Sequence, residues 1–445
     1  MRPAHEPGLR EAGPVGESGR APIVIATIAR EQGTTGVHTH VRELRHALER
    51  SGHPAELVTP RSWARGRGAA PRRLLLLALF GTGAVLERVS GPAHVWWYRT
   101  SHELFLRRAL ARRLGDAGPC TVYAQCPLAA RAALSARSGP HQRVVLAVHF
   151  RISQADEWAD KGMVGREGAV YRWIRSTERA VVPRVDGLVF VSEWARAAVR
   201  AWLPQVGRVP STVVHNFVAD PQAGARTQPG YAVPDVPAPG PPAPGDLVSV
   251  GSLEAVKNHR YLLRVLAAAR RSGHAYTLDV FGEGVERGRL LALAEELGIS
   301  DQVRLQGFRR DVAERLPGYR AYVHASYSES SSFAIMEAMA AGLPVLSSSE
   351  GALRELFDDG VEGRFWPIDD PEEAARVLVE LLEDGEGLAA AARAARRRFL
   401  RDYDAAAVAP RLVRFLQADG RGTAAASGSF PAPRPAPAGS RRARR

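Results

Sequence analysis

The sequence predicts an α/β protein made of two doubly wound domains. Short apolar runs alternate with helical patterns in both halves of the 445-residue chain, and this alternation is typical of parallel sheets covered by helices. Residues 221–245 are rich in Pro and Gly and lack periodicity, which marks a linker between the halves. The apolar content of 45% is that of a globular protein. We therefore expect one sheet on each side of the linker.

The first half, residues 21–220, opens with a strand, a turn-rich loop from Glu31 to Gly36 and a helix. A second strand follows, which completes a strand–helix–strand unit of the doubly wound kind. Ser192 follows a later strand and is expected to cap the next helix. The expected strands are 23–28, 55–58, 121–124, 144–148, 188–191 and 212–214, and the expected helices include 37–51 and 193–202.

One apolar run in this half, residues 74–86, needs its own interpretation. It is shorter than the roughly 20 residues that cross a bilayer, and Gly81 and Gly83 interrupt it. We expect a core helix. The alternative is a helix that touches a membrane surface, with Arg72 and Arg73 at its start.

The second half, residues 246–404, repeats the alternation of strands and helices. The expected strands are 247–250, 276–281, 303–306, 363–366, one that ends at Val323 and one that starts at Val345; the expected helices are 260–272, 286–297, 312–316, 333–341, 352–358 and 371–383. A last helical segment spans 408–417. Residues 1–20 and 420–445 lack apolar periodicity, so we expect them to be disordered.

The net charge of +13 is unevenly placed. Residues 21–220 hold 28 basic and 15 acidic side chains, whereas residues 241–420 hold 22 and 28. A basic half suits an anionic partner such as a membrane or a lipid diphosphate, although high Arg usage alone also explains it. No nucleic acid partner is expected, because no recognised binding motif is present. Cys120 and Cys126 are too few for a disulfide framework and lack zinc-site spacing.

The most informative stretch, residues 323–349, predicts strand, loop, helix and strand. The serines at 330–332 can cap the helix, and a Gly-x-Pro turn ends it. Glu329 lies in the loop and Glu337 about one turn inside the helix. The N–H groups and dipole of a helix N-terminus favour phosphate, while carboxylates accept hydrogen bonds from hydroxyls. This combination suits a sugar nucleotide.

Glu329, seven intervening residues, Glu337 and the following AMAAGLPV resemble the E-x7-E signature of retaining, nucleotide-sugar-dependent glycosyltransferases of family four, the glycosyl transferases group 1. The resemblance covers roughly residues 22–418. It implies the GT-B fold, in which two Rossmann-like domains face a central cleft, and a helix within 405–419 that returns to the first domain. Family members often read E-G-F-G after the first Glu; this chain has three serines there, so donor-sugar specificity does not transfer.

Lys257 follows the first strand of the second half, in a chain with 58 Arg and only two Lys. An ammonium is a compact charge that can follow a departing diphosphate. Similar glycosyltransferases have Gly-Arg-Leu and then Lys here, and both cations hold the donor diphosphate. Lys257 matches that pattern, whereas Ser252 stands where the family has Arg.

His149 ends strand 144–148, where the family has a His that faces the donor sugar. Gly36 matches one of two adjacent family glycines in the first loop. Gly282-Glu283-Gly284 lacks the third Gly of a dinucleotide fingerprint, so NAD is rejected. The expected catalytic residues are His149, Glu329 and Lys257, and the expected donor-binding residues are Gly36, Gly251, Ser252, Lys257, Glu329, Ser332, Phe333, Ala334 and Glu337.

No Asp-x-Asp pair lies in a strand-end loop. We therefore expect Lys257 and the helix dipole, rather than a metal ion, to neutralise the leaving diphosphate, with no cofactor. A paired-carboxylate glycosidase is not favoured, because a helix N-terminus lies between Glu329 and Glu337.

These observations predict a retaining glycosyltransferase that moves a sugar from a UDP- or GDP-sugar to a hydroxyl acceptor. The basic first half favours a lipid-linked acceptor in envelope, exopolysaccharide or glycolipid synthesis, and a cytoplasmic protein that either stays in solution or contacts the anionic inner face of the membrane. A soluble natural product as acceptor is the alternative within this class. The alternative from another class is a GT-B binding protein without catalytic activity.

Overall fold

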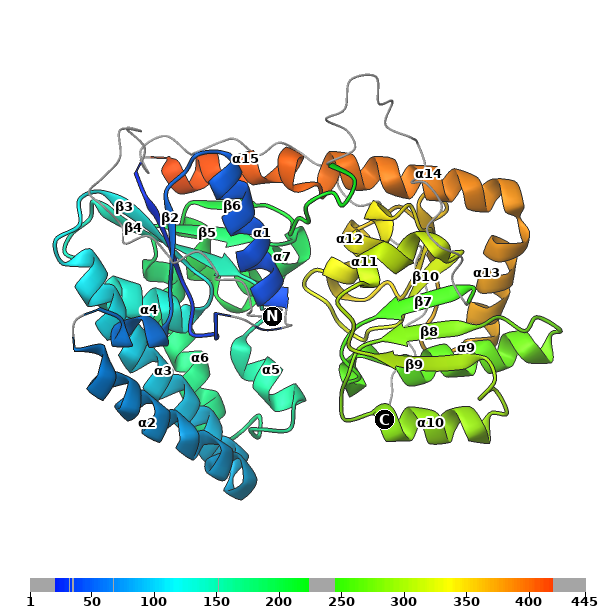
Figure 1. The fold of residues 1–445 in the computed structure, drawn as a ribbon, viewed down its shortest axis with the longest axis horizontal. Helices are drawn as coiled ribbons and strands as arrows, with labels where there is room; N and C mark the ends of the chain where they lie inside the picture. Colours follow the sequence, from blue (N-terminus) through cyan, green and yellow to red (C-terminus); the bar gives the residue numbers. More distant parts are fainter. Residues whose placement is uncertain are drawn as a thin grey trace, which may run out of the picture.

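Two six-stranded parallel sheets form two domains that lie side by side (Figure 1). The computed structural model describes residues 21–31, 33, 36–66, 68–150, 152–223 and 245–418. The disorder expected for 1–20 and 420–445, and most of the expected linker, fall outside the described residues.

The first sheet has the strand order β2-β1-β3-β4-β5-β6. Its four central strands are buried because helices cover both faces of a parallel sheet, whereas its two edge strands are partly exposed. The strands of this sheet are β1 (Ile23–Ala26), β2 (Ala55–Val58), β3 (Cys120–Ala124), β4 (Gln142–Val148), β5 (Gly187–Phe190) and β6 (Ser211–Val213).

The second sheet has the order β12-β11-β10-β7-β8-β9. Its strands are β7 (Leu247–Val250), β8 (Leu278–Phe281), β9 (Val303–Gly307), β10 (Ala321–His324), β11 (Val345–Ser347) and β12 (Gly363–Phe365). The chain reverses its direction across the sheet once in each domain, between β1 and β3 and between β7 and β10. Ligands of doubly wound sheets bind outside the carboxyl ends of the strands at this switch point. The fold class predicted from the sequence is confirmed.

Helices connect the strands and cover the sheets. In the first domain they are α1 (Gly36–Arg50), α2 (Ala69–Val89), α3 (Gly91–Leu114), α4 (Pro127–Ala136), α5 (Gln154–Asp160), α6 (Ala169–Val181) and α7 (Glu193–Trp202). In the second they are α9 (His259–Arg271), α10 (Arg287–Glu296), α11 (Val312–Arg315), α12 (Phe333–Ala340), α13 (Pro371–Glu383) and α14 (Gly385–Asp402).

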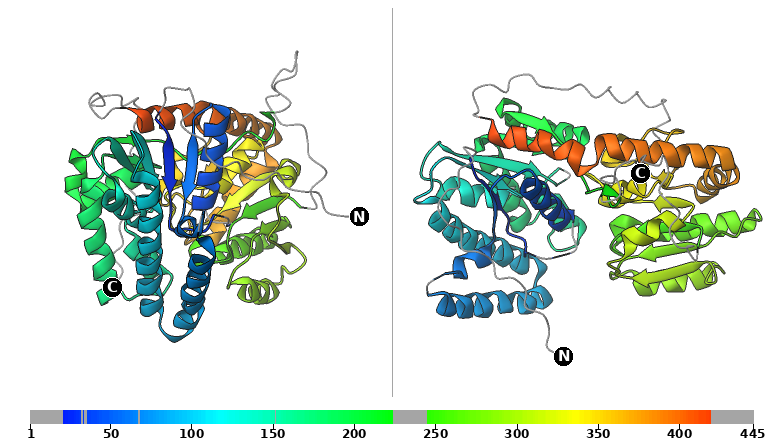
Figure 2. Two further views of the ribbon diagram at one scale, coloured as in Figure 1. Left: turned by 60° about the vertical axis from the view of Figure 1, so that its left-hand side comes forward. Right: turned by 45° about the horizontal axis from the view of Figure 1, so that its top comes forward.

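The last helix, α15 (Ala405–Gln417), packs on the first sheet although it follows the second domain in the chain (Figure 2). Leu412 and Leu416 join the buried cluster that contains Ile23 and Ile25 of β1. The Thr121 hydroxyl donates a hydrogen bond to the Leu416 carbonyl at 2.7 Å. The chain thus crosses between the domains twice, which ties their positions to each other.

The second crossing is held by a buried ion pair. The Arg396 guanidinium on α14 donates two hydrogen bonds of 2.9 Å to the carboxylate of Asp220, and one of 2.8 Å to the Ala340 carbonyl. Both charged side chains are almost wholly buried, so each needs the other to offset the cost of leaving water.

A second contact between the domains lies at the start of α7. The carboxylate of Glu355 from the second domain accepts hydrogen bonds from the backbone N–H groups of Glu193 and Trp194 at 2.8 and 2.5 Å. These N–H groups have no partner within the helix. The carboxylate satisfies their hydrogen bonds, and its negative charge interacts favourably with the positive end of the helix dipole. Ser192 caps the same helix by accepting from the N–H of Ala195, as predicted.

Two local predictions are wrong. The helix expected at 352–358 is a short 3-10 helix, Gly351–Glu355. The core helix expected for 74–86 is α2, which runs through Gly81 and Gly83 and leaves Leu74 and Leu77 each 68% exposed. Gly83 has a packing role in this helix. It lies against α3, and an added Cβ would come within 2.7 Å of the Trp97 ring.

Candidate active site

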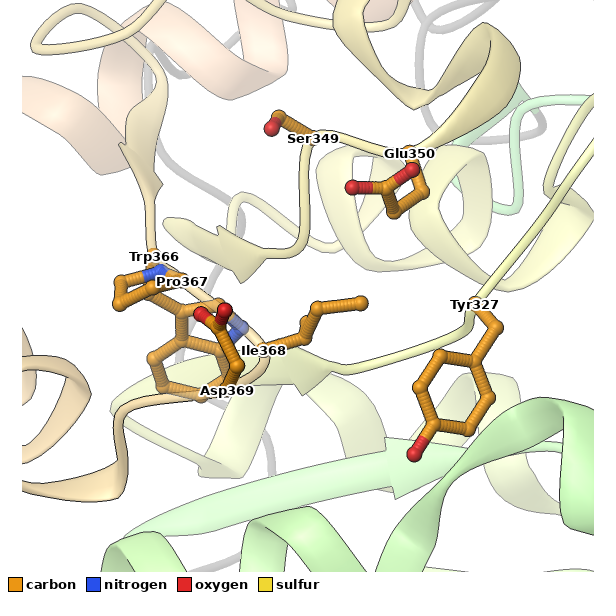
Figure 3. Close-up of a pocket in the computed structure, with 7 residues that line it drawn as sticks. All are labelled: Tyr327, Ser349, Glu350, Trp366, Pro367, Ile368 and Asp369. Atoms are coloured by element: carbon orange, nitrogen blue, oxygen red, sulfur yellow. The ribbon is translucent and has the colours of Figure 1, made fainter. Parts of the chain in front are cut away.

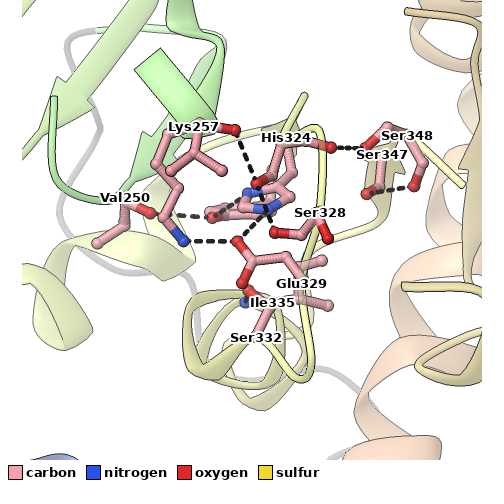
Figure 4. A network of polar contacts seen from close by, with 12 residues as sticks. Val250, Lys257, His324, Ser328, Glu329, Ser332, Ile335, Ser347 and Ser348 are labelled. Atoms are coloured by element: carbon pink, nitrogen blue, oxygen red, sulfur yellow. Dashed lines mark hydrogen bonds and ion pairs between the residues drawn. The ribbon is translucent and has the colours of Figure 1, made fainter. Parts of the chain in front are cut away.

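The loops after β7 and β10 meet at the switch point of the second sheet. The Lys257 ammonium lies 2.5 Å from Oε1 of Glu329, which joins the two loops by an ion pair (Figure 4). The Glu329 side chain is buried and that of Lys257 is partly exposed. The geometry places the cation and the first carboxylate predicted from the sequence next to each other.

The loop that carries Lys257 is fixed at its backbone. The Val256 carbonyl accepts hydrogen bonds from the Ser326 hydroxyl and the Tyr327 N–H, both at 3.0 Å. Asn258 follows with φ of 54°, and it is the only non-glycine residue with positive φ among the described residues. Left-handed backbone outside Gly costs free energy and is concentrated at functional sites. Lys257 therefore occupies a defined position.

His324, at the end of β10, is a member of this cluster that sequence reasoning missed. Its Nε2 lies 3.3 Å from Glu329 Oε1, and its ring is buried. Burial by itself raises the pKa of Glu329, but the Lys257 ammonium and His324 more than offset it, so this pKa lies at about 2. Burial lowers the pKa of His324. Glu329 is thus a carboxylate at neutral pH.

Helix α12 begins beside this carboxylate. Ser332 is its N-cap and accepts a hydrogen bond from the Ile335 N–H at 3.5 Å. Behind the loop, the Glu329 carbonyl accepts from the Ala352 N–H at 2.9 Å. Gly351 is required there, because its φ is +62° and a Cβ would come within 2.5 Å of that carbonyl. The loop presents Glu329 and the start of α12 on one side.

Glu337 lies on α12 and is half-buried. Burial, the largest effect, raises the pKa of Glu337 to about 7; Glu43 of α1 acts in the same direction and Arg42 opposes both. Two carboxyl groups of one motif therefore differ in protonation near neutral pH. One is held ionised by a cation, and the other gains or loses its proton around pH 7.

His149 follows β4 in the first domain and faces this motif across the domain boundary. The Ser330 hydroxyl donates a hydrogen bond of 2.7 Å to the His149 carbonyl. The His149 Nε2 lies 2.9 Å from the buried Gln125 Oε1, and its ring meets that of His40 edge-on at 4.5 Å between centroids. Burial lowers the pKa of His149 well below its usual value, with a smaller effect of His40.

The partners of His149 are held in turn. His40 Nδ1 lies 3.1 Å from Asn216 Oδ1, and burial lowers the pKa of His40 to about 4. The Gln125 amide donates to the Tyr123 carbonyl at 3.4 Å, which leaves its Oε1 to accept from His149. His149 is therefore neutral and carries its proton on Nε2.

The remaining predicted residues lie around the same junction. Gly36 starts α1, and its Cβ position is 3.5 Å from the Phe333 ring of the other domain. Ala334 follows on α12 and is half-buried. Gly251 is half-buried after β7, whereas Ser252 is exposed. Among the described residues, no group of three or more His, Cys, Asp or Glu side chains could hold a metal ion.

Gly282 and Gly284 serve packing. A Cβ on Gly282 would come within 1.8 Å of the Gly251 carbonyl, and one on Gly284 within 2.4 Å of the Leu253 carbonyl. The two glycines let the loop after β8 press against the backbone of the loop that leads to Lys257. This contact explains the Gly-x-Gly pattern without a dinucleotide.

A separate cavity of about 450 Å³ opens at the carboxyl ends of β10, β11 and β12 (Figure 3). Its lining comprises Tyr327, Ser349, Glu350, Trp366, Pro367, Ile368 and Asp369. None of these is a predicted site residue. The cavity adjoins the site, because Tyr327 lies in the same loop as Glu329, and Glu350 precedes Gly351, which packs on the Glu329 carbonyl.

Comparisons with known proteins agree with this geometry. The family described as "Glycosyltransferase Family 4" matches residues 34–220, and "Glycosyl transferases group 1" matches residues 240–398. Together with two Rossmann-like domains, the matches define a GT-B glycosyltransferase. The chain belongs to the group 1/family 4 glycosyltransferases, which confirms the resemblance seen in the E-x7-E stretch.

Curated relatives match part of the chain. A D-inositol 3-phosphate glycosyltransferase of Thermobispora bispora is 40% identical over 136 residues, which are 30% of this chain and 31% of that protein. The N-acetylgalactosamine-N,N'-diacetylbacillosaminyl-diphospho-undecaprenol 4-alpha-N-acetylgalactosaminyltransferase of Campylobacter jejuni is 31% identical over 139 residues, 31% of this chain and 37% of that protein. The matched stretch spans about a third of these relatives.

Solved structures match more of the chain at lower identity. Anabaena HepE in complex with UDP has a TM-score of 0.58 and 16% identity, covering 89% of this chain and 99% of that one. Sucrose-phosphate synthase of Thermosynechococcus elongatus has a TM-score of 0.62 and 16% identity, covering 89% and 98%. At such identities the likeness shows the fold.

Proposed function

We propose that this protein is a retaining, metal-independent glycosyltransferase that takes a hexose from a UDP- or GDP-sugar and gives it to a hydroxyl acceptor. The observation that carries the proposal is the meeting of Lys257, Glu329 and the start of α12 at the switch point of the second sheet. A cation and helix N–H groups suit a diphosphate, and an ionised carboxylate suits sugar hydroxyls.

Each residue has a role in this proposal. Lys257 and the N–H groups at the start of α12 hold the diphosphate, Glu329 accepts from hydroxyls of the sugar, and Glu337 accepts from the ribose. In the transfer, the bond between C1 and the phosphate oxygen breaks and its electron pair leaves with the nucleoside diphosphate. The acceptor oxygen bonds to C1 and gives up its proton to that diphosphate or to solvent. His149 approaches from the first domain, neutral and oriented by Gln125.

We place the acceptor on a lipid carrier, in envelope, exopolysaccharide or glycolipid synthesis at the inner face of the membrane. The basic charge of residues 21–220 supports this, and the name of the Campylobacter relative includes diphospho-undecaprenol. A soluble natural product is the alternative acceptor.

A binding protein without turnover is the second candidate, and Ser252 favours it, because this exposed residue supplies no second cation beside Lys257. Release of nucleoside diphosphate from UDP- and GDP-sugars, with acceptor present, separates the two. The proposal predicts turnover by the wild type that falls at least about 100-fold in Glu329→Gln, while Glu295→Gln on the exposed side of α10 retains it. NMR of the anomeric proton tests retention. A retaining enzyme gives a product with the same anomeric configuration as the donor sugar. No turnover despite donor binding supports the second candidate.

A further inference from the structure

Helix α2 carries its apolar side chains on the outside of the protein. Leu74 and Leu77 are each 68% exposed, Val85 is 61% exposed and Val89 is 78% exposed. Only Leu76 and Gly83 of its 21 residues are buried. A surface helix normally turns its polar residues to water. A contiguous apolar surface of this kind marks an interaction site.

The exposed and packed residues lie on opposite sides of α2. Leu74, Leu77, Gly81 and Val85 follow one another at spacings of three, four and four, which places them along one side of a helix. The opposite side packs against α3 and the 3-10 helix Pro60–Ala64, in a cluster of Leu76, Leu79, Phe80, Trp63, Ala64 and Phe105. The outer side of α2 therefore stays exposed to solvent after folding.

Exposed arginines lie near both ends of this apolar face. Residues 61–114 contain eleven Arg and two Glu. Arg73 and Arg88 lie near the two ends of α2, and Arg107 lies on α3; all three are exposed and form no ion pair among the described residues. Apolar side chains framed by Arg are the composition of helices that lie in the interface of an anionic bilayer.

Helix α2 has the length and composition of a membrane span, since it has 21 residues and contains an 18-residue window with a mean hydropathy of 1.4. Its packing decides against a span. Lipid on all sides would require α2 to leave α3, to which it is joined through the single residue Ser90, and would expose the packed face. One packed face and one apolar free face suit a helix that lies along a membrane surface.

We propose that the exposed face of α2 docks this protein on the surface of an anionic lipid bilayer. Figures 1 and 2 place α2 on the outer edge of the first domain, with α3 between it and the sheet. The start of α3 packs on α5 and α6 through Val95, Ala155 and Ile174, and α5 follows the loop after His149. Docking thus holds the loop on the proposed acceptor side close to the bilayer. The purpose of docking, access to a lipid-linked acceptor, rests on the proposed function. Membrane binding by the α2 face can be tested without turnover.

The test is flotation of the full chain with vesicles made of equal parts phosphatidylglycerol and phosphatidylcholine. The wild type should float. The combined variant Leu74→Glu/Leu77→Glu/Val85→Glu should bind the vesicles at least about tenfold more weakly. Leu291→Glu, an equally apolar exposed position on α10, is the matched control and should float like the wild type. The single variant Leu77→Glu guards against misfolding of the triple variant. Nucleotide-sugar binding in all of them reports an intact second domain.

A second arm tests the cations. Arg73→Glu/Arg88→Glu should weaken flotation several-fold, high salt should do the same, and Arg397→Glu on the exposed side of α14 should have no effect. Wild type that stays in solution, or an α2 variant that floats as well as the wild type, overturns the proposal. A dimer that dissociates in the α2 variants, with no flotation of the wild type, also overturns it, because a second copy then covers this face. Loss of donor binding with flotation retained would instead refute the proposed function alone.

Discussion

The Lys257 ammonium and the Glu329 carboxylate lie 2.5 Å apart, so the cation and the anion of the candidate donor site neutralise each other in the ligand-free protein. A diphosphate that enters the site competes with Glu329 for Lys257, and a sugar hydroxyl competes with Lys257 for Glu329. The ion pair keeps both groups oriented until the donor replaces it.

This pairing predicts a coupling in stability. Lys257→Ala leaves the buried Glu329 with only His324 beside it and should cost about 2 kcal/mol of unfolding free energy. Because the folded pKa of Glu329 lies below its unfolded value, this stabilisation is present above about pH 4.5 and is lost as the pH falls through about 2. Denaturant unfolding at pH 7 measures it. Lys257→Ala/Glu329→Ala should cost less than the sum of the single variants, and additive costs would show that the pair is not coupled.

Glu337 predicts a pH dependence of donor binding. With a pKa of about 7 it is roughly one-tenth ionised at pH 6 and nine-tenths at pH 8. If the carboxylate binds the ribose, affinity for a UDP- or GDP-sugar should rise about ninefold from pH 6 to pH 8. Titration calorimetry at the two pH values measures this, and the diphosphate diester of the donor does not itself titrate there. Glu337→Gln should remove the pH step; equal affinity of the wild type at both values would refute the ribose role.

Gln125 is predicted to orient His149. Gln125→Leu removes the acceptor at the His149 Nε2 and should lower kcat about tenfold with little change in KM, less than the roughly 100-fold loss expected for His149→Ala. Gln125→Glu keeps an acceptor and adds a negative charge, which should raise the pKa of His149 and introduce a pH dependence below neutrality. A pH profile identical to that of the wild type in Gln125→Glu would leave Gln125 with a packing role only.

Gly282 and Gly288 form a matched pair for stability. Gly282→Ala forces a Cβ into the Gly251 carbonyl, so Tm should fall by about 5 °C or more. An added Cβ at Gly288, within α10, meets nothing within 4 Å, and Ala is the better helix former by about 1 kcal/mol, so Gly288→Ala should hold or raise Tm. Thermal unfolding checks both. NAD should leave Tm unchanged, and stabilisation by NAD would contradict the packing role of these glycines.

Strands and capped helices could be predicted from the sequence where several local signals agree. Strands 55–58 and 247–250 have the predicted bounds, because Pro54 directly precedes the first and Gly245 lies two positions before the second. Helices 193–202 and 371–383 also match, since Ser192 and Asp370 supply caps. Helix α2 was misjudged on two counts. Gly81 and Gly83 were taken to interrupt the apolar run, although the helix extends well beyond it on both sides, and the run was assumed to be buried, whereas burial depends on what the rest of the chain covers.

Only part of the candidate site could be predicted from the sequence. Lys257, Glu329 and Glu337 follow strand ends or a helix start, where local sequence is informative. His324 is the last residue of β10, and nothing in the sequence shows that its ring turns toward Glu329. Gln125 and Asn216 are 24 and 67 positions from His149, so only the fold brings them together. A polar residue at the end of a strand beside the switch point, or directly after it, is the signal that could have suggested His324 and Gln125.

The measurement that tests the central claim most directly is a thermal-shift screen of UDP-, GDP-, ADP- and dTDP-sugars against the wild type, Lys257→Ala, Glu337→Ala and the control Glu295→Ala. Our account predicts that a UDP- or GDP-sugar raises the Tm of the wild type and the control, since a ligand of the native state stabilises it, and that the shift is lost in Lys257→Ala and Glu337→Ala. An equal shift in all four proteins, or none in the wild type, would contradict a donor site at Lys257, Glu329 and the start of α12.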